Sequence, residues 1–222
     1  MLASLQEDLQ KTYRIETPMQ VSDYLISQQT FLSLLEITQS QALSMNEQIL
    51  IIEDNDNIQV ALFIAEEIMS KVEKLSQHYS FWEIFNEYCI AFECVSHFVY
   101  IAYKYLQTQP VSCLELELQS EVDKYIHCCE KLWEQGKDPL KEKLSDKLFL
   151  NISFTKNLTD EERGRYETAN TLAYYYVKFL EYSFLRNRLI EDFYWNIRNF
   201  YRMSFFDKQR YIQSVFTREK NL

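Results

Sequence analysis

Apolar residues recur three or four positions apart along most of this chain, and this spacing predicts a protein built mainly from α-helices. The stretch from Ser80 to Leu106 is apolar on nearly every side. A helix of that kind lies inside a core, so we expect it to be the central helix of a bundle. Further helices are expected at about residues 4–17, 21–42, 65–75, 112–133, 140–150, 159–188 and 190–216, with a fresh start at Ser204.

One segment, at about residues 48–64, departs from the helical spacing. Two short runs, Gln48–Glu53 and Ile58–Phe63, flank the polar residues Asp54–Asn57, which favour a turn. Strand-sized runs on either side of a polar turn predict a β-hairpin. The predicted fold class is therefore mainly α, a multi-helix bundle with one small β-hairpin.

The composition agrees with long helices and few breaks, because the 222 residues include only two glycines and three prolines. The simplest organisation is a single helical domain over residues 1–222. An alternative division places the N-terminal helices and the hairpin in residues 1–76 and a helical core in residues 77–222. The sequence shows no internal repeat at a fixed period, so a repeat architecture is not expected.

The net charge of −10 is unevenly distributed. Residues 186–222 hold eight basic and four acidic side chains, a net charge of +4, which leaves −14 for the rest of the chain. An acidic body repels phosphate backbones, so no nucleic-acid partner is expected. The basic C-terminal part could instead dock on the acidic body or on an acidic protein.

Five cysteines, an odd number, favour free thiols in a reducing cytosol. The first residues lack the basic and apolar pattern of a secretory signal. The longest uncharged stretch of the central helix, Cys94–Tyr103, is much shorter than the roughly 20 residues of a membrane-spanning helix. We therefore predict a cytoplasmic protein without a transmembrane segment.

Glu93 and His97 interrupt the apolar central stretch. Side chains four residues apart on a helix lie on one face, one turn apart. A buried polar group that lacks a partner costs about 1–3 kcal/mol. We expect these two residues to pair with each other or with Lys124, in a buried polar cluster that also includes Glu117 and Glu121.

The same region allows a metal site as an alternative, because helical bundles hold metal ions with carboxylates and imidazoles from several helices. The protein would then be a metal-dependent, di-iron-like helical oxidoreductase, with iron or another divalent metal as cofactor. The usual Glu-x-x-His motif is absent, since Cys94 stands at the place of the glutamate, and a polar cluster without a cofactor is the preferred prediction. The candidate ligands are Glu93, His97, Glu117, Glu121, Asp123 and His127.

Basic and aromatic residues alternate in the C-terminal part of the chain, where Trp195, Arg198, Tyr201 and Arg202 are the candidate interaction residues. Tryptophan, tyrosine and arginine are favoured at protein interfaces. Packing of these aromatics into the core is the competing prediction, and we prefer it. The leading functional hypothesis is a non-catalytic interaction or regulatory protein that binds another protein, or itself as a homodimer, through this part or the hairpin edge.

Two segments in the middle of the chain, Ser96–Tyr100 (SHFVY) and Leu114–Tyr125 (LELELQSEVDKY), resemble an uncharacterised family of helical bacterial proteins. The resemblance implies a helical fold and a bacterial, cytosolic origin. It brings no activity, cofactor or partner with it, so the functional hypotheses depend on the residues themselves.

Overall fold

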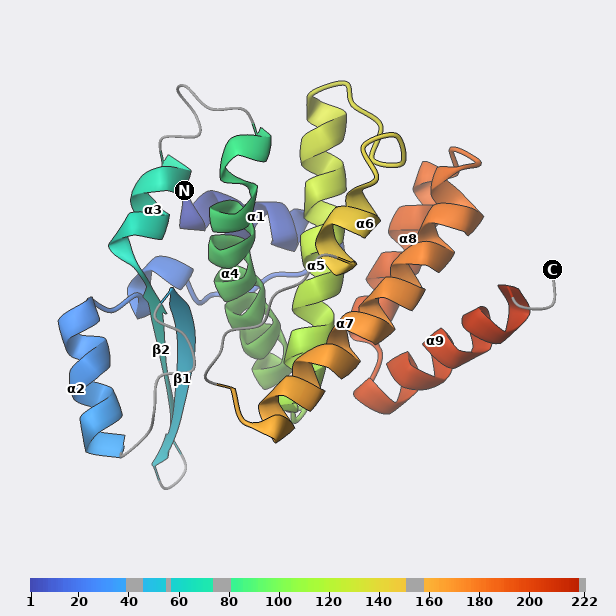
Figure 1. Ribbon diagram of the computed structural model, residues 1–222. Helices are drawn as coiled ribbons and strands as arrows, with labels where there is room; N and C mark the ends of the chain where they lie inside the picture. The colour runs from blue at the N-terminus through green and yellow to red at the C-terminus, as the bar shows by residue number, and fades with distance from the viewer. Residues whose placement is uncertain (39–45, 55–56, 74–80, 151–157, 220–222) are drawn as a thin grey trace.

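The computed structural model describes residues 1–38, 46–54, 57–73, 81–150 and 158–219. Over these residues the fold is mainly α-helical with one two-stranded antiparallel sheet, as the sequence pattern predicts (Figure 1). The helices are α1 (Leu2–Tyr13), α2 (Gln28–Thr38), α3 (Glu66–Glu73), α4 (Phe85–Leu106), α5 (Cys113–Glu134), α6 (Leu144–Phe149), α7 (Asp160–Leu180), α8 (Ile190–Arg202) and α9 (Phe205–Glu219). Shorter helical turns are η1 (Val21–Tyr24), η3 (Phe81–Ile84) and the π-helical η4 (Glu181–Leu185), and the strands are β1 (Glu47–Asp54) and β2 (Asn57–Ile64).

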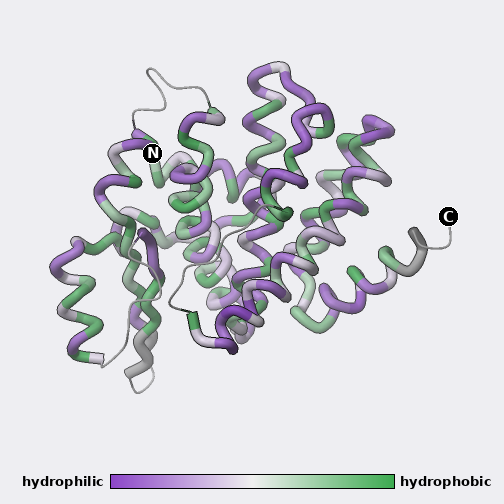
Figure 2. Tube along the Cα trace, in the orientation of Figure 1, coloured by the Kyte–Doolittle hydropathy of each residue, from purple (hydrophilic) through white to green (hydrophobic). Residues whose placement is uncertain are grey.

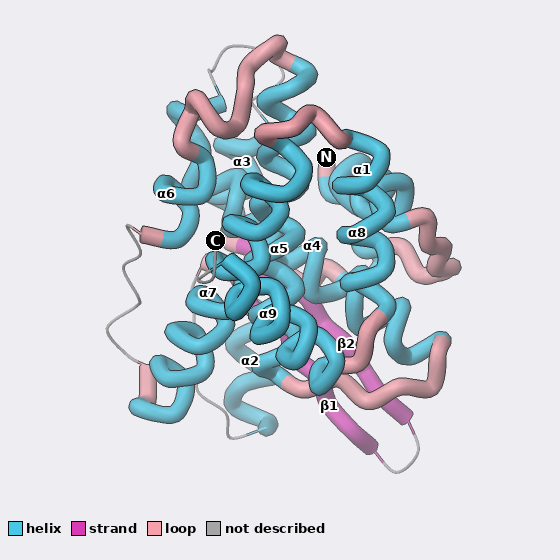
Figure 3. Tube along the Cα trace, turned by 90° about the vertical axis from the view of Figure 1, so that its right-hand side faces the viewer, coloured by secondary structure: helices cyan, strands magenta, loops and turns pink. Residues whose placement is uncertain are grey.

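The antiparallel helices α4 and α5 form the centre of the protein (Figure 1). Helix α7 packs along α5, α1 contacts both central helices, and α3 packs on α4. Helix α8 contacts α1, and α9 contacts α7. Figure 3, viewed from the side of α8 and α9, shows the strands behind these helices. The apolar stretch is the core helix, as predicted, because Phe92, Val95 and Val99 of α4 are fully buried.

Hydrophobic and hydrophilic residues alternate along most of the helices (Figure 2), as expected where one face of each helix is buried. One continuous cluster of buried residues includes Leu62 and Ile68 together with Phe92 and Tyr125. The core therefore extends across the boundary considered after residue 76. Among the helices described, none combines the length and the apolar character that crossing a membrane requires.

The hairpin lies between α2 and α4 and has the predicted position. Its strands pair in register from Glu47 opposite Ile64 to Asp54 opposite Asn57. On one side the ring of Phe63 stacks on Phe31 of α2, with 4.3 Å between the ring centroids. The opposite side packs on α4, and this contact places the beginning of β1 beside the central helices.

One predicted helix, residues 21–42, is wrong in its first part. The short turn η1 leads into Leu25, which forms a parallel bridge with Leu62 of β2. The amide of Ile26 donates a hydrogen bond of 2.8 Å to the carbonyl oxygen of Leu62, so α2 begins only at Gln28. Pairing with the hairpin overrides the local helical preference here. Residues 39–42 of the prediction lie outside the described residues.

The predicted helix starts have mixed outcomes. Ser112 caps α5, and Thr159 forms a complete capping box at the start of α7, as predicted. Ser4 lies inside α1, which begins at Leu2, so the predicted start at that residue is wrong. The predicted cap at Ser80 lies outside the described residues.

Candidate metal centre

Polar side chains meet along the interface between α4 and α5. The two helices are antiparallel and closely connected, so residues face one another in order, beginning at the connecting loop. Successive pairs therefore lie farther from the loop on both helices. The pairs are Tyr100 with Glu115 (2.6 Å), His97 with Glu117 (3.6 Å), Glu93 with Lys124 (2.8 Å) and Tyr88 with His127 (2.5 Å).

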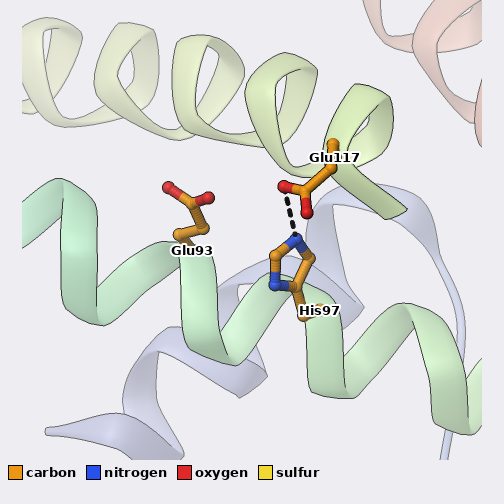
Figure 4. A group of neighbouring side chains, drawn as sticks. All are labelled: Glu93, His97 and Glu117. Atoms are coloured by element: carbon orange, nitrogen blue, oxygen red, sulfur yellow. Dashed lines mark ion pairs between the residues drawn. The ribbon is translucent and has the colours of Figure 1, made fainter. Parts of the chain in front are cut away.

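Glu93, His97 and Glu117 converge in this interface, and we call them the triad. Each offers one ligand atom, a carboxylate oxygen or an imidazole nitrogen, and these atoms all lie within 4.8 Å of one another. Figure 4 shows Glu93 and His97 projecting from α4, with Glu117 facing His97 from α5. Metal–ligand bonds of about 2.0–2.2 Å bring ligand atoms to about 3–3.5 Å from one another. Rotation of the flexible glutamate side chains would supply this contraction.

The imidazole of His97 is poorly satisfied in this arrangement. Its Nε2 atom is buried, and within the described residues it makes no hydrogen bond. The distance of 3.6 Å to Oε2 of Glu117 exceeds hydrogen-bond length. The side chain of His97 is only 9% exposed. The side chains of His97 and Glu117 therefore form an ion pair without a hydrogen bond, and a bound cation would give this nitrogen a direct bond in its place.

Negative charge dominates the electrostatics of the triad. Burial lowers the pKa of His97, but the carboxylates of Glu117, Glu93 and Glu47 outweigh burial and raise it to about 9. Burial, followed by the nearby charge of Glu93, raises the pKa of Glu47 to about 8. Both groups therefore hold a proton at neutral pH.

A cavity of about 240 Å³ lies between β1, α4, α5 and the first turns of α7, and we call it the triad cavity. All three residues of the triad line it, together with Glu47 from β1 and Arg165 from α7. The triad is therefore accessible to a small molecule inside an otherwise packed helical interface. The remaining lining residues are Gln48, Ile49, Ile51, Cys113, Leu116 and Tyr166.

The structure places Glu121 and Lys124 in the same interface as the triad. The Nζ atom of Lys124 donates hydrogen bonds of 2.8 Å to both Glu93 and Glu121. Burial lowers the pKa of Lys124, but these two carboxylates outweigh it and raise the pKa well above its ordinary value. Lys124 is therefore charged, and Glu121 is its ion-pair partner rather than a member of the triad.

Asp123 faces away from the triad, contrary to its place among the predicted ligands. Its carboxylate accepts hydrogen bonds from the hydroxyls of Tyr13 and Ser96 and from the amide of Gln119. Asp123 is six residues beyond Glu117. Because successive residues turn by about 100° around a helix axis, the two side chains point in directions about 240° apart. The carboxylate joins α1 to the central helices instead.

His127 also lies apart from the triad, and its inclusion among the ligands is corrected too. It is ten residues beyond Glu117, about 15 Å along α5. Its Nε2 atom forms a hydrogen bond of 2.5 Å with the hydroxyl of Tyr88, and its ring stacks on Phe92. Burial lowers the pKa of His127 to about 3, so the ring is neutral. His127 is a core residue.

Sequence reasoning missed Glu47 and Arg165, which line the triad cavity. Glu47 is the first residue of β1, and Arg165 lies in the second turn of α7. Both lie far along the chain from the triad, and their approach depends on how the hairpin and α7 pack on the central helices. No local spacing in the sequence signals that packing.

The candidate interaction residues of α8 divide between surface and core. Trp195 is 69% exposed, whereas Tyr201 is fully buried and stacks on Tyr13, which corrects its assignment to a surface. Arg198 donates a hydrogen bond of 2.7 Å to the carbonyl oxygen of Thr12, and Arg202 donates one of 2.9 Å to that of Tyr13. The two arginines therefore join α8 to the end of α1.

No protein-family model, curated protein or solved structure matches this chain. The resemblance to uncharacterised helical bacterial proteins therefore stays a prediction. The geometry of the triad and its cavity is therefore the basis for inferring a function.

Proposed function

We propose that this protein binds one divalent transition-metal ion through Glu93, His97 and Glu117. The observation that carries the proposal is the convergence of three ligand atoms within 4.8 Å, one of them a buried imidazole nitrogen that makes no hydrogen bond within the described residues. Mixed imidazole and carboxylate ligands suit zinc, iron and manganese. One ion suits three ligands, so a mononuclear site replaces the di-iron-like centre considered from the sequence.

The open side of the site favours a catalytic role over a structural one. Structural zinc sites are usually closed by four protein ligands, whereas catalytic sites keep a coordination position for water or substrate. Three ligands beside the triad cavity of about 240 Å³ match the second type. We therefore infer a metal-dependent helical enzyme. The interaction hypothesis has less support, because Arg198 and Arg202 are engaged with α1 and Tyr201 is buried.

Metal binding can be measured directly. The purified protein is stripped with a chelator and titrated separately with Zn²⁺, Mn²⁺ and, without oxygen, Fe²⁺, and the bound metal is counted by mass spectrometry. We expect one ion per chain, and affinity at least about tenfold lower in Glu93→Gln, His97→Gln and Glu117→Gln. Glu134→Gln is the matched control, because Glu134 lies on α5 but is 63% exposed.

Circular dichroism separates loss of a ligand from loss of the fold. A variant that keeps its helical spectrum and still loses the metal supports the proposal. Substoichiometric metal in the wild-type protein after reconstitution would refute it, as would an equal loss of affinity in Glu134→Gln.

A further inference from the structure

Arg165 lines the triad cavity and has unused hydrogen-bonding capacity. Its Nε atom is buried and, within the part of the chain that the structure describes, has no hydrogen-bond partner. Oε1 of Glu117 lies 4.0 Å from this nitrogen, beyond hydrogen-bond length. A guanidinium presents a planar fork of donors that matches a carboxylate. Its position beside the triad therefore suits recognition of an anion.

The size and walls of the cavity restrict what that anion can be. The volume of about 240 Å³ lies below the roughly 300–1,000 Å³ of pockets for drug-sized ligands. Ile49, Ile51 and Leu116 supply apolar wall, which suits a short hydrocarbon body. A small molecule with one anionic end and an aliphatic remainder fits both features.

Charge decides when such an anion can enter. Without a metal, the carboxylates of Glu93 and Glu117 line the cavity and disfavour a further negative charge. A divalent cation on the triad would offset both of these charges, and the positive charge of Arg165 would then attract the entering anion. The metal-loaded cavity then accepts a singly charged carboxylate more readily than a doubly charged phosphate.

We propose that the triad cavity binds a small aliphatic carboxylate, with Arg165 donating hydrogen bonds to the carboxylate oxygens. This inference rests on the metal site proposed above, because the cavity becomes receptive to an anion only when the triad holds a cation. Arg165 thus determines the class of substrate, and the metal determines whether the substrate binds.

Cys113 provides a reporter of occupancy, because it lines the cavity and its side chain is exposed. The rate at which a maleimide modifies Cys113 is measured by peptide mass spectrometry in the full-length protein, with and without Mn²⁺. Butyrate is the probe, and butyramide and inorganic phosphate are the controls. We expect butyrate to slow modification several-fold in the Mn²⁺-loaded protein and to have no effect in the metal-free protein.

Variants on the same helix identify the recognising group. Arg165→Gln should abolish protection by butyrate while Mn²⁺ still binds with one ion per chain. The control Arg163→Gln, which changes an exposed arginine of α7, should behave as the wild type. Equal protection by butyramide or phosphate would overturn the carboxylate assignment, and so would protection that survives Arg165→Gln.

The two proposals fail in different ways. If Mn²⁺ binds and butyrate gives no protection, the carboxylate site is overturned and the metal site stands. Arg165→Gln could instead weaken Mn²⁺ binding and still show unchanged butyrate protection once excess Mn²⁺ saturates the site. In that case Arg165 positions Glu117 and does not bind the anion. If no metal binds to the wild-type protein, the metal site itself falls, and the anion site with it.

Discussion

Lys124 bridges two carboxylates from different helices, Glu93 on α4 and Glu121 on α5, with its Nζ atom 2.8 Å from an oxygen of each. The lysine side chain is 10% exposed, and the two glutamates are 19% and 18% exposed. One oxygen of Glu93 is therefore held by an ammonium in the metal-free protein. Lys124 and a metal ion would compete for the same carboxylate.

Replacement of Lys124 by glutamine should destabilise the metal-free protein by about 3 kcal/mol, because it leaves two largely buried carboxylates unpaired. The same change should strengthen metal binding by roughly tenfold, because Glu93 loses its competitor. Denaturant unfolding with a chelator and with saturating Zn²⁺ measures both effects. Lys131→Gln is the control, because its partners Asp8 and Glu134 are 36% and 63% exposed and the expected cost is below about 1 kcal/mol. Equal costs in the two variants would contradict the argument.

The metal-free protein should lose the stabilising contribution of His97 as the pH rises. The pKa of His97 is raised from 6.5 to about 9 in the folded chain, so between these values the folded state holds more protons than the unfolded state. Stability from this group is fully present below about pH 6.5 and disappears through pH 9. Burial lowers the pKa of Lys208 to about 7, which acts in the opposite direction at alkaline pH.

The His97 contribution is isolated by the difference in unfolding free energy between the wild type and His97→Gln. This difference, on the order of 2 kcal/mol at pH 6, should shrink toward zero by pH 9.5. Zn²⁺ affinity of the wild type should rise over the same interval, because protons on His97 and Glu47 compete with the metal. A pH-independent metal affinity would exclude displacement of these protons.

The sequence predicts the fold well because most of its signals are local. Helical spacing, the cap at Ser112 and the two strand-sized runs of the hairpin each depend on neighbouring residues, and the structure confirms them. The predicted helix over residues 21–42 is wrong in its first part because Leu25 bridges to Leu62 of the hairpin, a contact between distant segments. Local patterns carry no information on such pairing.

The triad could be anticipated only in part. Glu93 and His97 share a helix face, so their proximity follows from spacing, and the antiparallel partner helix then brings Glu117 opposite them. The sequence makes Asp123 a plausible ligand, but the rotation of α5 directs its carboxylate toward Tyr13 and the buried side chain of Lys208. Side-chain direction across a helix pair depends on axial rotation, which one sequence does not fix.

Removal of the Tyr13 hydroxyl should weaken the attachment of α1 to the central helices. Tyr13 is fully buried and donates to the carboxylate of Asp123, so Tyr13→Phe takes a donor from a buried acceptor and should cost about 1–3 kcal/mol. Tyr194→Phe is the matched control, because Tyr194 also donates to a carboxylate, that of Glu130, but is partly exposed. The melting temperature of Tyr13→Phe should be lower than that of Tyr194→Phe. The reverse order would contradict the role of the Tyr13 hydroxyl in attaching α1.

Deletion of residues 190–222 should abolish folding rather than remove a detachable binding surface. In this segment Phe193, Ile197 and Phe200 are at most 1% exposed. Loss of such buried side chains costs about 2–5 kcal/mol each. Trp195→Ala, by contrast, changes a side chain that is 69% exposed and should leave the melting temperature unchanged. Soluble yield and circular dichroism of the two variants test the contrast. A truncated chain that stays helical and melts as the wild type would show that α8 and α9 are dispensable to the core, and it would restore the interaction-surface hypothesis.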